Sequence, residues 1–417
     1  MVRRLSKKLH VGFKVLAEQG VLGFMIVCLQ FVQKHTRKTS NSKHTGAIYT
    51  KAKYEDIVAA DFHIQRKVWT GTDRKILRFN WLMPPPGKGS GGHLNIFRFM
   101  KFLEDAGHEC RIYMYSQGSH GPVSAVRAIM GDSYPKLKAT GSMKWLDHTD
   151  DMEAADGIFA TSWETAYPVF NTKISAKRFY FVQDFEPYFY PAGSFRSFAE
   201  NTYRFGFFGI TAGMWLAKKL EADFGMQTEY YNFGCDKTTY FFKNRGTRNE
   251  ILFYARPYTE RRGFETGIMA LDLFHKKHPE YTINLVGWDV SQYEIPFPYV
   301  NLKTLEVSQL NDLYNRCAAG LVLSFTNMSL LPLELLGSGA IPVVNDDDNN
   351  TQVSDNKYIA YSKNDPGSLA QTLSEVVTRN NPGRYAELAA ESVGTTSWEE
   401  SGKKFLSVVE KETRSHE

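Results

Sequence analysis

One carboxylate of this chain lies where it could bind a ligand: Glu334 lies between two apolar runs within residues 321–345. The stretch predicts a strand, a loop, a helix that opens on Pro-Leu-Glu, and a second strand at 340–344. The loops of such a βαβ unit meet ligands at the carboxyl edge of the sheet. A lone carboxylate there can accept hydrogen bonds from a pair of sugar hydroxyls. A solvated helix residue would have the same spacing, so both interpretations stay open.

Two arginines, Arg256 and Arg262, stand six residues apart where an expected strand at 250–255 ends and the next helix begins. Guanidinium groups placed in this way would converge on one diphosphate, because each can form bidentate, charge-assisted bonds to its oxygens. Arg261 is the alternative to Arg262 for this role. The alternative interpretation is that these arginines form surface ion pairs on a strand–helix loop.

Glycines gather at positions 87, 89, 91 and 92, after an expected strand at 75–83 and before an expected helix at 94–106. Backbone N–H groups at a helix N terminus can approach an anion closely when no Cβ intervenes. Gly91 and Gly92 are therefore candidates for holding a phosphate, and a simple tight turn is the alternative. The next expected strand, at 110–115, ends without an acid, which argues against a dinucleotide dehydrogenase.

Another expected strand, at 281–286, ends on Gly287, and a short apolar segment at 301–305 follows it. Backbone groups of that segment, with Lys303 and Leu305, could contact a nucleobase. An open parallel sheet assembles its ligand site at the carboxyl ends of its strands. Five candidates agree on that placement: Arg256, Arg262, Gly287, Lys303 and Glu334.

The alternation of strands and helices predicts parallel sheets, and it restarts after a polar, irregular stretch at 236–248. We expect two α/β domains, at 46–245 and 246–396, with a helix at 397–417 that packs back toward the first. A chain of 417 residues that is 42% hydrophobic can bury two such cores. The four cysteines lack metal-site or disulfide spacing, which fits a reducing cytoplasm.

Charge is unevenly distributed along the chain. The first 53 residues hold eleven Lys or Arg against one acid, a net charge of +10, so the rest carries −5 within a total of +5. The acidic body argues against nucleic-acid binding. The apolar run at 21–32 would span roughly 18 Å as a helix, short of a bilayer's ~30 Å. We expect residues 1–45 to form a basic amphipathic helix on an anionic membrane surface; packing onto the body or a partner, and secretion, are the alternatives.

Several segments are similar, in order, to the donor half of GT-B glycosyltransferases of retaining family four: ILFYARPYTERRGFETGIMAL, INLVGWD, VSQLNDLYNRCAAGLVLSF and LPLELLGSGAIPVV. The resemblance covers roughly residues 75–410. It implies two facing Rossmann-like domains, with the nucleotide-sugar held by the second. Within that family, FVQDFEPYFYP and the basic N-terminal helix look like the L-rhamnosyltransferases of bacterial surface-layer glycan and O-antigen assembly, which use dTDP-β-L-rhamnose.

The resemblance implies that Glu334 is the second glutamate of the family's Glu-x7-Glu pattern and holds the ribose hydroxyls. The first glutamate falls on Thr326, so this chain lacks it. Its contact with the donor sugar must then pass to another side chain, or to backbone groups of Ser329, Leu330 and Leu331.

A histidine of the family, which faces the donor sugar and its O6, corresponds here to Gln183 or Asp184. A 6-deoxy sugar has no O6 hydroxyl, so the loss is consistent with rhamnose. The resemblance further implies that the leaving diphosphate accepts the proton of the acceptor on the same sugar face. Arg256, Arg262 and the glycine N–H groups would stabilise its departing charge.

The expected activity is transfer of L-rhamnose from dTDP-β-L-rhamnose to a growing lipid-linked glycan at the inner face of the cell membrane. No cofactor and no metal are expected: the acids at 346–348 could bind Mg²⁺, but the arginines already supply the positive charge. Phe185, Tyr188 and Tyr190 could stack on acceptor sugars or line the cleft wall. Another nucleotide-sugar, a nucleotide-sugar epimerase and a catalytically silent glycan-binding scaffold are the alternatives, and a homodimer stays open.

Overall fold

The computed structural model describes residues 50–63, 69–87, 90–117, 120–133, 142–395 and 397–415. The segment Thr50–Glu417 forms one compact unit. The extension expected at 1–45 lies outside the described residues. Within the described ranges, no helix is long and apolar enough to cross a membrane.

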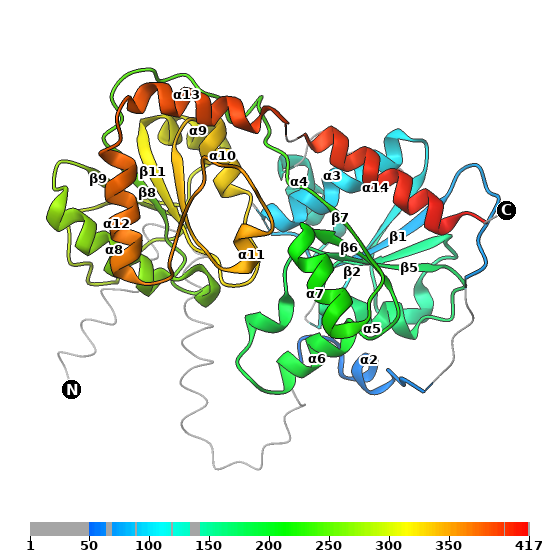
Figure 1. Ribbon diagram of the computed structural model, residues 1–417. Coiled ribbons are helices and arrows are strands. Elements are labelled where there is room, and N and C mark those ends of the chain that lie inside the picture. The colour runs from blue at the N-terminus through cyan, green and yellow to red at the C-terminus, as the bar shows by residue number, and fades with distance from the viewer. Residues whose placement is uncertain are drawn as a thin grey trace, which may run out of the picture. The chain divides into compact units, whose positions relative to one another are not determined.

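Seven parallel strands form the first sheet, in the order β3-β2-β1-β4-β5-β6-β7 (Figure 1). The strand order reverses between β1 and β4, and an open α/β sheet binds ligands at such a switch point. The strands are β1 (Arg78–Met83), β2 (Glu109–Met114), β3 (Met143–Trp145), β4 (Gly157–Ala160), β5 (Lys177–Val182), β6 (Phe208–Ala212) and β7 (Thr228–Tyr231).

Helices α3 and α14 lie on one face of this sheet, and α5 and α7 lie on the other (Figure 1). The buried residues of α3 recur at helical spacing, at positions 96, 97, 99, 100 and 103, so one stripe of the helix faces the strands. The helices of this half are α2 (Tyr54–Val58), α3 (Gly91–Asp105), α4 (Val123–Ser133), η1 (Thr149–Asp151), α5 (Trp163–Asn171), η2 (Glu186–Phe189), α6 (Ser194–Thr202) and α7 (Met214–Phe224).

Six parallel strands form the second sheet, in the order β10-β9-β8-β11-β12-β13. Here the order reverses between β8 and β11, so the loops that follow these two strands are neighbours. The strands are β8 (Glu250–Tyr254), β9 (Thr282–Val286), β10 (Val300–Lys303), β11 (Cys317–Val322), β12 (Ile341–Asn345) and β13 (Ala360–Ser362).

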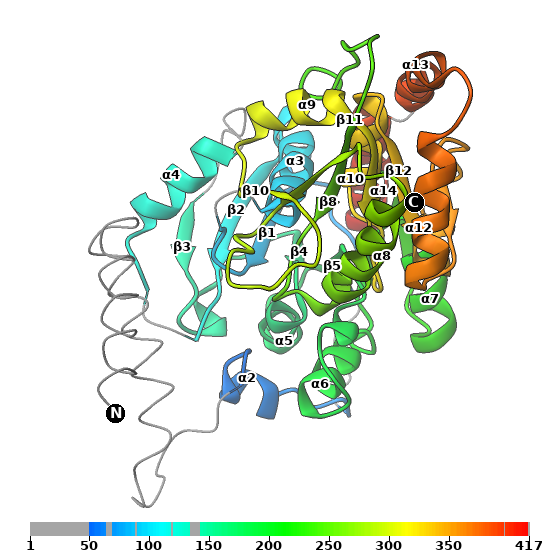
Figure 2. The same cartoon turned by 90° about the vertical axis from the view of Figure 1, so that its left-hand side faces the viewer.

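Helices α8 and α12 pack against each other on one face of the second sheet, and α9 and α10 lie on the other (Figures 1 and 2). Gly267 of α8 lets this helix approach the sheet closely, because a Cβ at this position would lie 2.1 Å from Cζ of Phe253. The helices are η3 (Glu260–Arg262), α8 (Phe264–Lys277), α9 (Val307–Arg316), α10 (Leu331–Gly337), α11 (Asp348–Thr351), α12 (Pro366–Val377), α13 (Pro382–Ser392) and η4 (Val393–Thr395).

The last helix, α14 (Trp398–Thr413), contacts α3 and β7 of the first sheet (Figure 1). Phe405 is 2% exposed and lies in the aromatic core with Trp81 and Phe99. Nε2 of His108 lies 3.0 Å from Oε1 of Glu410. The chain thus returns to its first half after completing the second.

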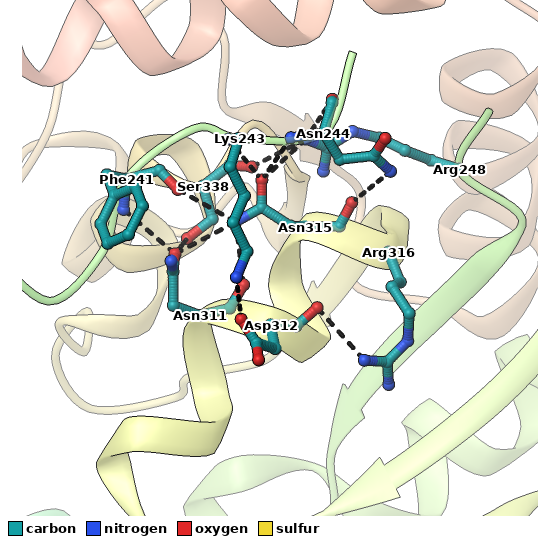
Figure 3. Close-up of polar contacts among 9 residues, drawn as sticks. All are labelled: Phe241, Lys243, Asn244, Arg248, Asn311, Asp312, Asn315, Arg316 and Ser338. Atoms are coloured by element: carbon teal, nitrogen blue, oxygen red, sulfur yellow. Dashed lines mark hydrogen bonds and ion pairs between the residues drawn. The ribbon is translucent and has the colours of Figure 1, made fainter. Parts of the chain in front are cut away.

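The connector between the sheets is held by asparagine amides on α9 (Figure 3). Oδ1 of Asn315 accepts from the N–H groups of Lys243 and Asn244 at 2.9 and 3.1 Å. Oδ1 of Asn311 accepts from the N–H of Phe241 at 3.0 Å. These bonds pair backbone groups of a segment that has no sheet or helix partners of its own, and they fix its course where the second sheet begins.

The two parallel sheets confirm the predicted fold class of two Rossmann-like α/β domains. Element ends differ from the prediction by a few residues: the helix expected at 94–106 begins at Gly91 and ends at Asp105. Cys110, Cys235 and Cys317 are buried and form no disulfide bond among the described residues.

Candidate functional site

The loop between β8 and α8 brings Arg256, Arg261 and Arg262 to the switch point of the second sheet, and we refer to it as the arginine loop. Nη1 of Arg262 donates to Oγ of Ser324 at 2.8 Å, which joins the loop after β8 to the loop after β11. Nη1 of Arg256 donates to the hydroxyl of Tyr254 at 3.1 Å. Gly263 caps α8 with a φ of +57°, and a Cβ there would lie 2.8 Å from the ring of Phe325. The tight approach of these two loops therefore needs glycine.

A carboxylate from the first sheet faces these arginines. Oδ2 of Asp184 lies 3.5 Å from Nε of Arg261. Burial raises the pKa of Asp184, while Arg262 and Arg261 oppose that rise. Burial lowers the pKa of Arg262, and Asp184 opposes that fall. The cluster therefore holds an excess of positive charge in a desolvated place, which is a setting for an anionic ligand.

Arg261 is held by a ring as well as by a charge. Its guanidinium lies 4.0 Å from the ring centroid of Phe189, the last residue of η2. The carbonyl of Arg261 accepts from the N–H of Phe325 at 3.1 Å. Segment η2 of the first half and η3 of the second are thus in direct contact.

The loop after β11 is built on hydrogen bonds to Ser324. The backbone carbonyl of Ser324 accepts from the side-chain amides of Asn345, Asn349 and Asn350 at 2.8, 2.9 and 3.0 Å. Further along, Nδ2 of Asn327 donates to two carbonyls of the first half, those of Gln183 and Ala212, each at 3.0 Å. The loop consequently lies across the carboxyl ends of β5 and β6.

Several buried polar atoms of this region lack a hydrogen-bond partner among the described residues. They are Oγ1 of Thr326, Oδ1 of Asn327, Oγ of Ser329 and Nε of Arg261. Buried polar groups are nearly always paired, so a cluster of unpaired ones indicates a further partner such as water or a ligand. The hydroxyl groups of a sugar could satisfy them.

The glycine loop of the first half reaches the same region through Gln183. Nε2 of Gln183 donates to the carbonyl of Gly92 at 3.0 Å. Oε1 of Gln183 accepts from Nδ2 of Asn95 at 3.3 Å. Helix α3 starts at Gly91, after the N-cap residue Ser90, and no atom lies within 4 Å of a Cβ built on Gly91. A side chain at Gly91 would therefore meet open space among the described residues, and the N–H of His93 donates to Oγ of Ser90 at 3.4 Å.

Glu334 lies in the first turn of α10, apart from the arginines. Burial raises its pKa to about 7, while Arg98 and a hydrogen bond with Tyr240 oppose the rise. In the ligand-free protein this carboxyl is therefore partly protonated at neutral pH. A ligand that donates hydrogen bonds to it would favour the anion. Leu330 caps α10, and Leu331 begins it.

Gly287 and Lys303 lie together at the ends of β9 and β10. The N–H of Gly287 donates to the carbonyl of Lys303 at 2.6 Å, and both residues have positive φ angles. The ammonium group of Lys303 forms an ion pair with Asp289, with Nζ 3.2 Å from Oδ2. Leu305 follows β10 and is partly buried. The charge of Lys303 is thus already paired in this structure.

The three candidate acceptor aromatics differ in exposure. Phe185 is 2% exposed and stacks on Tyr203, so it presents no free ring face. The hydroxyl of Tyr190 accepts from Nε1 of Trp163 at 3.0 Å and from Nζ of Lys51 at 3.1 Å. Tyr188 is 42% exposed and is the open ring of the set.

A hollow of about 580 Å³ lies beside the arginine loop, at the carboxyl ends of β11 and β12. Aromatic rings and carboxylates together are a surface that suits carbohydrate, because rings stack on sugar faces and carboxylates accept from hydroxyls. The lining residues are Trp215, Phe325, Asp346, Asp347, Asp348, Asn349 and Asn364.

The acidic run at 346–348 has a structural setting. Oδ2 of Asp347 accepts from the amide of Asn345 at 2.7 Å, and α11 begins at Asp348. Among the described residues, no group of three or more His, Cys, Asp or Glu side chains is arranged to hold a metal ion.

Known proteins resemble this chain in both sequence and structure. Residues 249–374 match the family described as the WsaF C-terminal domain. The O-antigen biosynthesis protein RfbC of Myxococcus xanthus is 32% identical to this chain over an alignment of 332 positions. The alignment covers 76% of this chain and 26% of that protein. The chain thus spans about a quarter of the length of this curated relative.

The structure resembles solved structures over most of its length. The crystal structure of Anabaena Alr3699/HepE in complex with UDP and glucose has a TM-score of 0.61 at 12% identity and covers 80% of this chain and 100% of its own. The crystal structure of TarM has a TM-score of 0.63 at 9% identity and covers 80% and 98%. The fold is GT-B. The arginine loop accordingly belongs to the second Rossmann-like domain of a GT-B fold, and Asp184 belongs to the first.

Two residues of this candidate site were not predicted from the sequence. Phe189 contacts Arg261, although the same aromatic run offered Phe185 and two tyrosines as candidates. The amide of Asn327 joins the two halves, and no spacing in the sequence signals this contact.

Proposed function

We propose that this chain is a retaining glycosyltransferase that transfers L-rhamnose from dTDP-β-L-rhamnose to a growing lipid-linked glycan of a surface polysaccharide or O-antigen. The supporting observation is the group of three arginines at the switch point of the second sheet. Arg262 is fixed there by Ser324, and Arg256 by Tyr254. A nucleoside diphosphate has the charge and the oxygen geometry that such a group recognises.

In the proposed mechanism, the leaving diphosphate takes the proton of the acceptor hydroxyl on the face where the new glycosidic bond forms. The protein stabilises the charge that develops on the diphosphate. Arg256 and Arg262 do this from the second half, and the N–H groups of Gly91 and Gly92 do it from the first. Desolvation of Arg262 strengthens its interaction with an anion.

The nucleoside would lie along the second sheet. Glu334 would accept a hydrogen bond from the 3′-hydroxyl of the deoxyribose and would bind it best as an anion. Backbone groups at Lys303 and Leu305, next to Gly287, would contact the base. Ser329, Leu330 and Leu331 would present N–H groups and one unpaired hydroxyl to the sugar and phosphates.

The choice of sugar and acceptor draws on relatives. The matched family at 249–374 is named for WsaF, and the curated relative is an O-antigen biosynthesis protein. The relative Alr3699/HepE was solved with UDP and glucose. The family's histidine that faces O6 corresponds here to Gln183 or Asp184, and its loss is consistent with a sugar that has no O6 hydroxyl. The acceptor glycan would lie over Tyr188 and the hollow at Trp215 and Phe325.

The basic extension at 1–45 would hold the enzyme at the cytoplasmic face of the membrane, where a lipid-linked acceptor is available. The extension holds nine Lys or Arg residues against one acid, a net charge of +8. Deletion of residues 1–45 should lower recovery of the protein with anionic liposomes. Unchanged recovery would contradict this part of the proposal.

The test of function has two steps. Thermal melting with dTDP, UDP, GDP and their sugar conjugates identifies the donor, because a ligand that binds only the native state raises the melting temperature. Transfer is then measured with that donor, with and without EDTA. We expect dTDP-β-L-rhamnose to stabilise most and transfer to survive EDTA. Sugar conversion without an acceptor would indicate an epimerase, and neither transfer nor donor hydrolysis would indicate a binding scaffold.

A further inference from the structure

The segment at 50–63 presents an apolar surface. Tyr54, Val58 and Phe62 follow one another at intervals of four residues and are 53%, 66% and 49% exposed. The first two lie one turn apart on α2, so they share one side of the helix. Phe62 follows the helix, and its ring centroid lies 5.4 Å from that of Phe205. A single exposed apolar residue is ordinary, but a group of neighbours forms a contact surface. We call these three residues the α2 patch.

The other side of α2 is fixed to the first Rossmann-like domain, where the helix contacts α5 (Figure 1). Asp56 is buried, and its Oδ2 and Oδ1 accept from the hydroxyls of Tyr115 and Thr149 at 2.7 and 3.0 Å. Nδ2 of Asn171 donates to the carbonyl of Asp56 at 2.8 Å. Because each residue of a helix turns by about 100°, the residues two positions before and after Asp56 point outward. The patch is thus held away from the body.

The patch begins beside a candidate acceptor residue. Nζ of Lys51 donates to the hydroxyl of Tyr190 at 3.1 Å and lies 4.5 Å from the centroid of that ring. Lys51 precedes Tyr54 by three residues, and Tyr190 follows β5 at the carboxyl edge of the first sheet. A surface that bound the α2 patch would therefore lie close to the acceptor side of this domain.

The charge of the preceding residues indicates which surface this is. Residues 1–53 carry a net charge of +10 and lead directly into the patch, so an anionic lipid surface attracts this part of the chain. A second copy of the chain would bring the same positive charge. Glu55 and Asp61 are exposed beside the patch, so the attraction comes from the basic residues and the patch adds apolar contact. Stable attachment to a bilayer takes two such signals.

We propose that the α2 patch enters the interface of an anionic membrane, with Tyr54, Val58 and Phe62 among the headgroups and the upper acyl chains. Aromatic rings with a polar end suit this depth. The inference goes beyond attachment by residues 1–45, because it places the first Rossmann-like domain itself on the lipid and turns its acceptor side toward a lipid-linked glycan. It rests on the membrane part of the proposed function.

Tyr54→Ser combined with Val58→Ser removes apolar surface and leaves the charge unchanged. The partition coefficient of the full chain on vesicles of phosphatidylethanolamine and phosphatidylglycerol, measured by sedimentation, should fall about tenfold. The loss should persist in high salt, which screens the contribution of the basic residues. Val58→Ser alone should cause a smaller loss, and it decides the test if melting curves show that the double variant does not fold.

Helix α8 of the second half offers the matched control. Met269 and Leu273 are an exposed apolar pair with the same spacing. Met269→Ser combined with Leu273→Ser should leave vesicle binding at the wild-type level. Sugar transfer to a water-soluble acceptor should be equal in the wild type and the α2 variant, because the patch does not contact the substrates.

Loss of vesicle binding at α2 without loss at α8 supports the inference. Unchanged binding of the α2 variant, or equal losses in both variants, overturns it and leaves attachment by residues 1–45 intact. Wild-type protein that does not bind the vesicles overturns this inference and the membrane part of the proposed function, while transfer to the water-soluble acceptor tests the enzymatic part separately. A dimer in analytical ultracentrifugation that the α2 variant loses would assign the patch to a second copy and overturn the inference.

Discussion

Arg262 and Ser324 are joined across the point where the strand order of the second sheet reverses, with Nη1 of Arg262 2.8 Å from Oγ of Ser324. One residue follows β8 and the other follows β11, and these two strands are neighbours only because of the crossover. The bond therefore depends on the topology, and it aims a desolvated guanidinium at the place where the sheet should bind its ligand.

Removal of this guanidinium should abolish most of the activity. Arg262→Ala is expected to lower the turnover of sugar transfer by about 10²–10³-fold, because a cation that stabilises the leaving group acts mainly in the transition state. Arg262→Lys should recover only part, since an ammonium cannot form the bidentate contact. The measurement is kcat for nucleoside diphosphate release with acceptor present.

Lys276→Ala is the control for that variant, because this residue lies on α8 and pairs with Asp272 at the surface. It should transfer sugar at the wild-type rate. If Arg262→Ala did so as well while remaining folded, the assignment of the diphosphate to this loop would be wrong.

The raised pKa of Glu334, about 7, predicts a pH dependence of stability. In the unfolded chain a glutamate titrates near pH 4.3. Between about pH 4.5 and 7 the folded protein thus retains a proton that the unfolded chain has released, so the free energy of unfolding falls as pH rises through this window. Glu334→Gln should remove that loss.

The measurement is the melting temperature of both proteins from pH 5 to 8 without ligand. The difference between Glu334→Gln and the wild type should become more positive toward pH 8. Parallel curves would mean that the carboxyl is not perturbed. Because the nucleoside hydroxyl donates best to the anion, nucleotide affinity of the wild type should rise over the same range and that of the variant should not.

Asn327 gives a prediction about how the halves are joined. Asn327→Ala leaves the carbonyls of Gln183 and Ala212 without their donor and should cost about 1–3 kcal/mol of unfolding free energy. Asn327→Asp should cost more, since it sets a carboxylate against two carbonyl oxygens. Chemical denaturation measures both.

Gln371→Ala removes a single exposed bond, to Oε1 of Glu375, away from the site, and serves as the control. It should cost less than either change at Asn327. Equal stability of Asn327→Ala and the wild type would show that the contact between the halves does not depend on this amide.

Most strands of both halves were accessible from the sequence, and some helices of the first half were not. Strands β8, β9, β11 and β12 are apolar runs set between helices of ordinary amphipathic pattern, so their existence could be predicted. Helix α5 could not, because seven of its nine residues are buried and Pro168 lies inside it. A helix that is buried all round shows no stripe.

The site shows the same division. The arginines and Glu334 could be predicted, since their positions follow from strand ends along the chain. The contact of Asn327 with the carbonyls of Gln183 and Ala212 could not, because it joins residues of different halves. No spacing in the sequence encodes such a contact, and it depends on how the two halves meet.

Gly267 tests the packing beneath the arginine loop. A Cβ there would lie 2.1 Å from Cζ of Phe253, a ring that is 0% exposed and cannot move aside. Gly267→Ala should therefore cost about 1–3 kcal/mol and displace α8, which starts directly after the arginine loop. Differential scanning calorimetry and nucleotide affinity would both register this change.

Gly131 provides the matched substitution, because it lies in helix α4 with no atom within 4 Å of its Cβ position. Gly131→Ala should stabilise the protein by up to about 1 kcal/mol through helix propensity. Loss of stability at Gly131 comparable to that at Gly267 would refute the steric explanation.

Hydrogen–deuterium exchange with and without dTDP-β-L-rhamnose tests the central claim most directly, because it locates the bound donor on the chain. The account predicts slower exchange at 255–264 and 323–335 of the second half and at 183–185 of the first. Protection confined to other segments, or none at saturating donor, would contradict it.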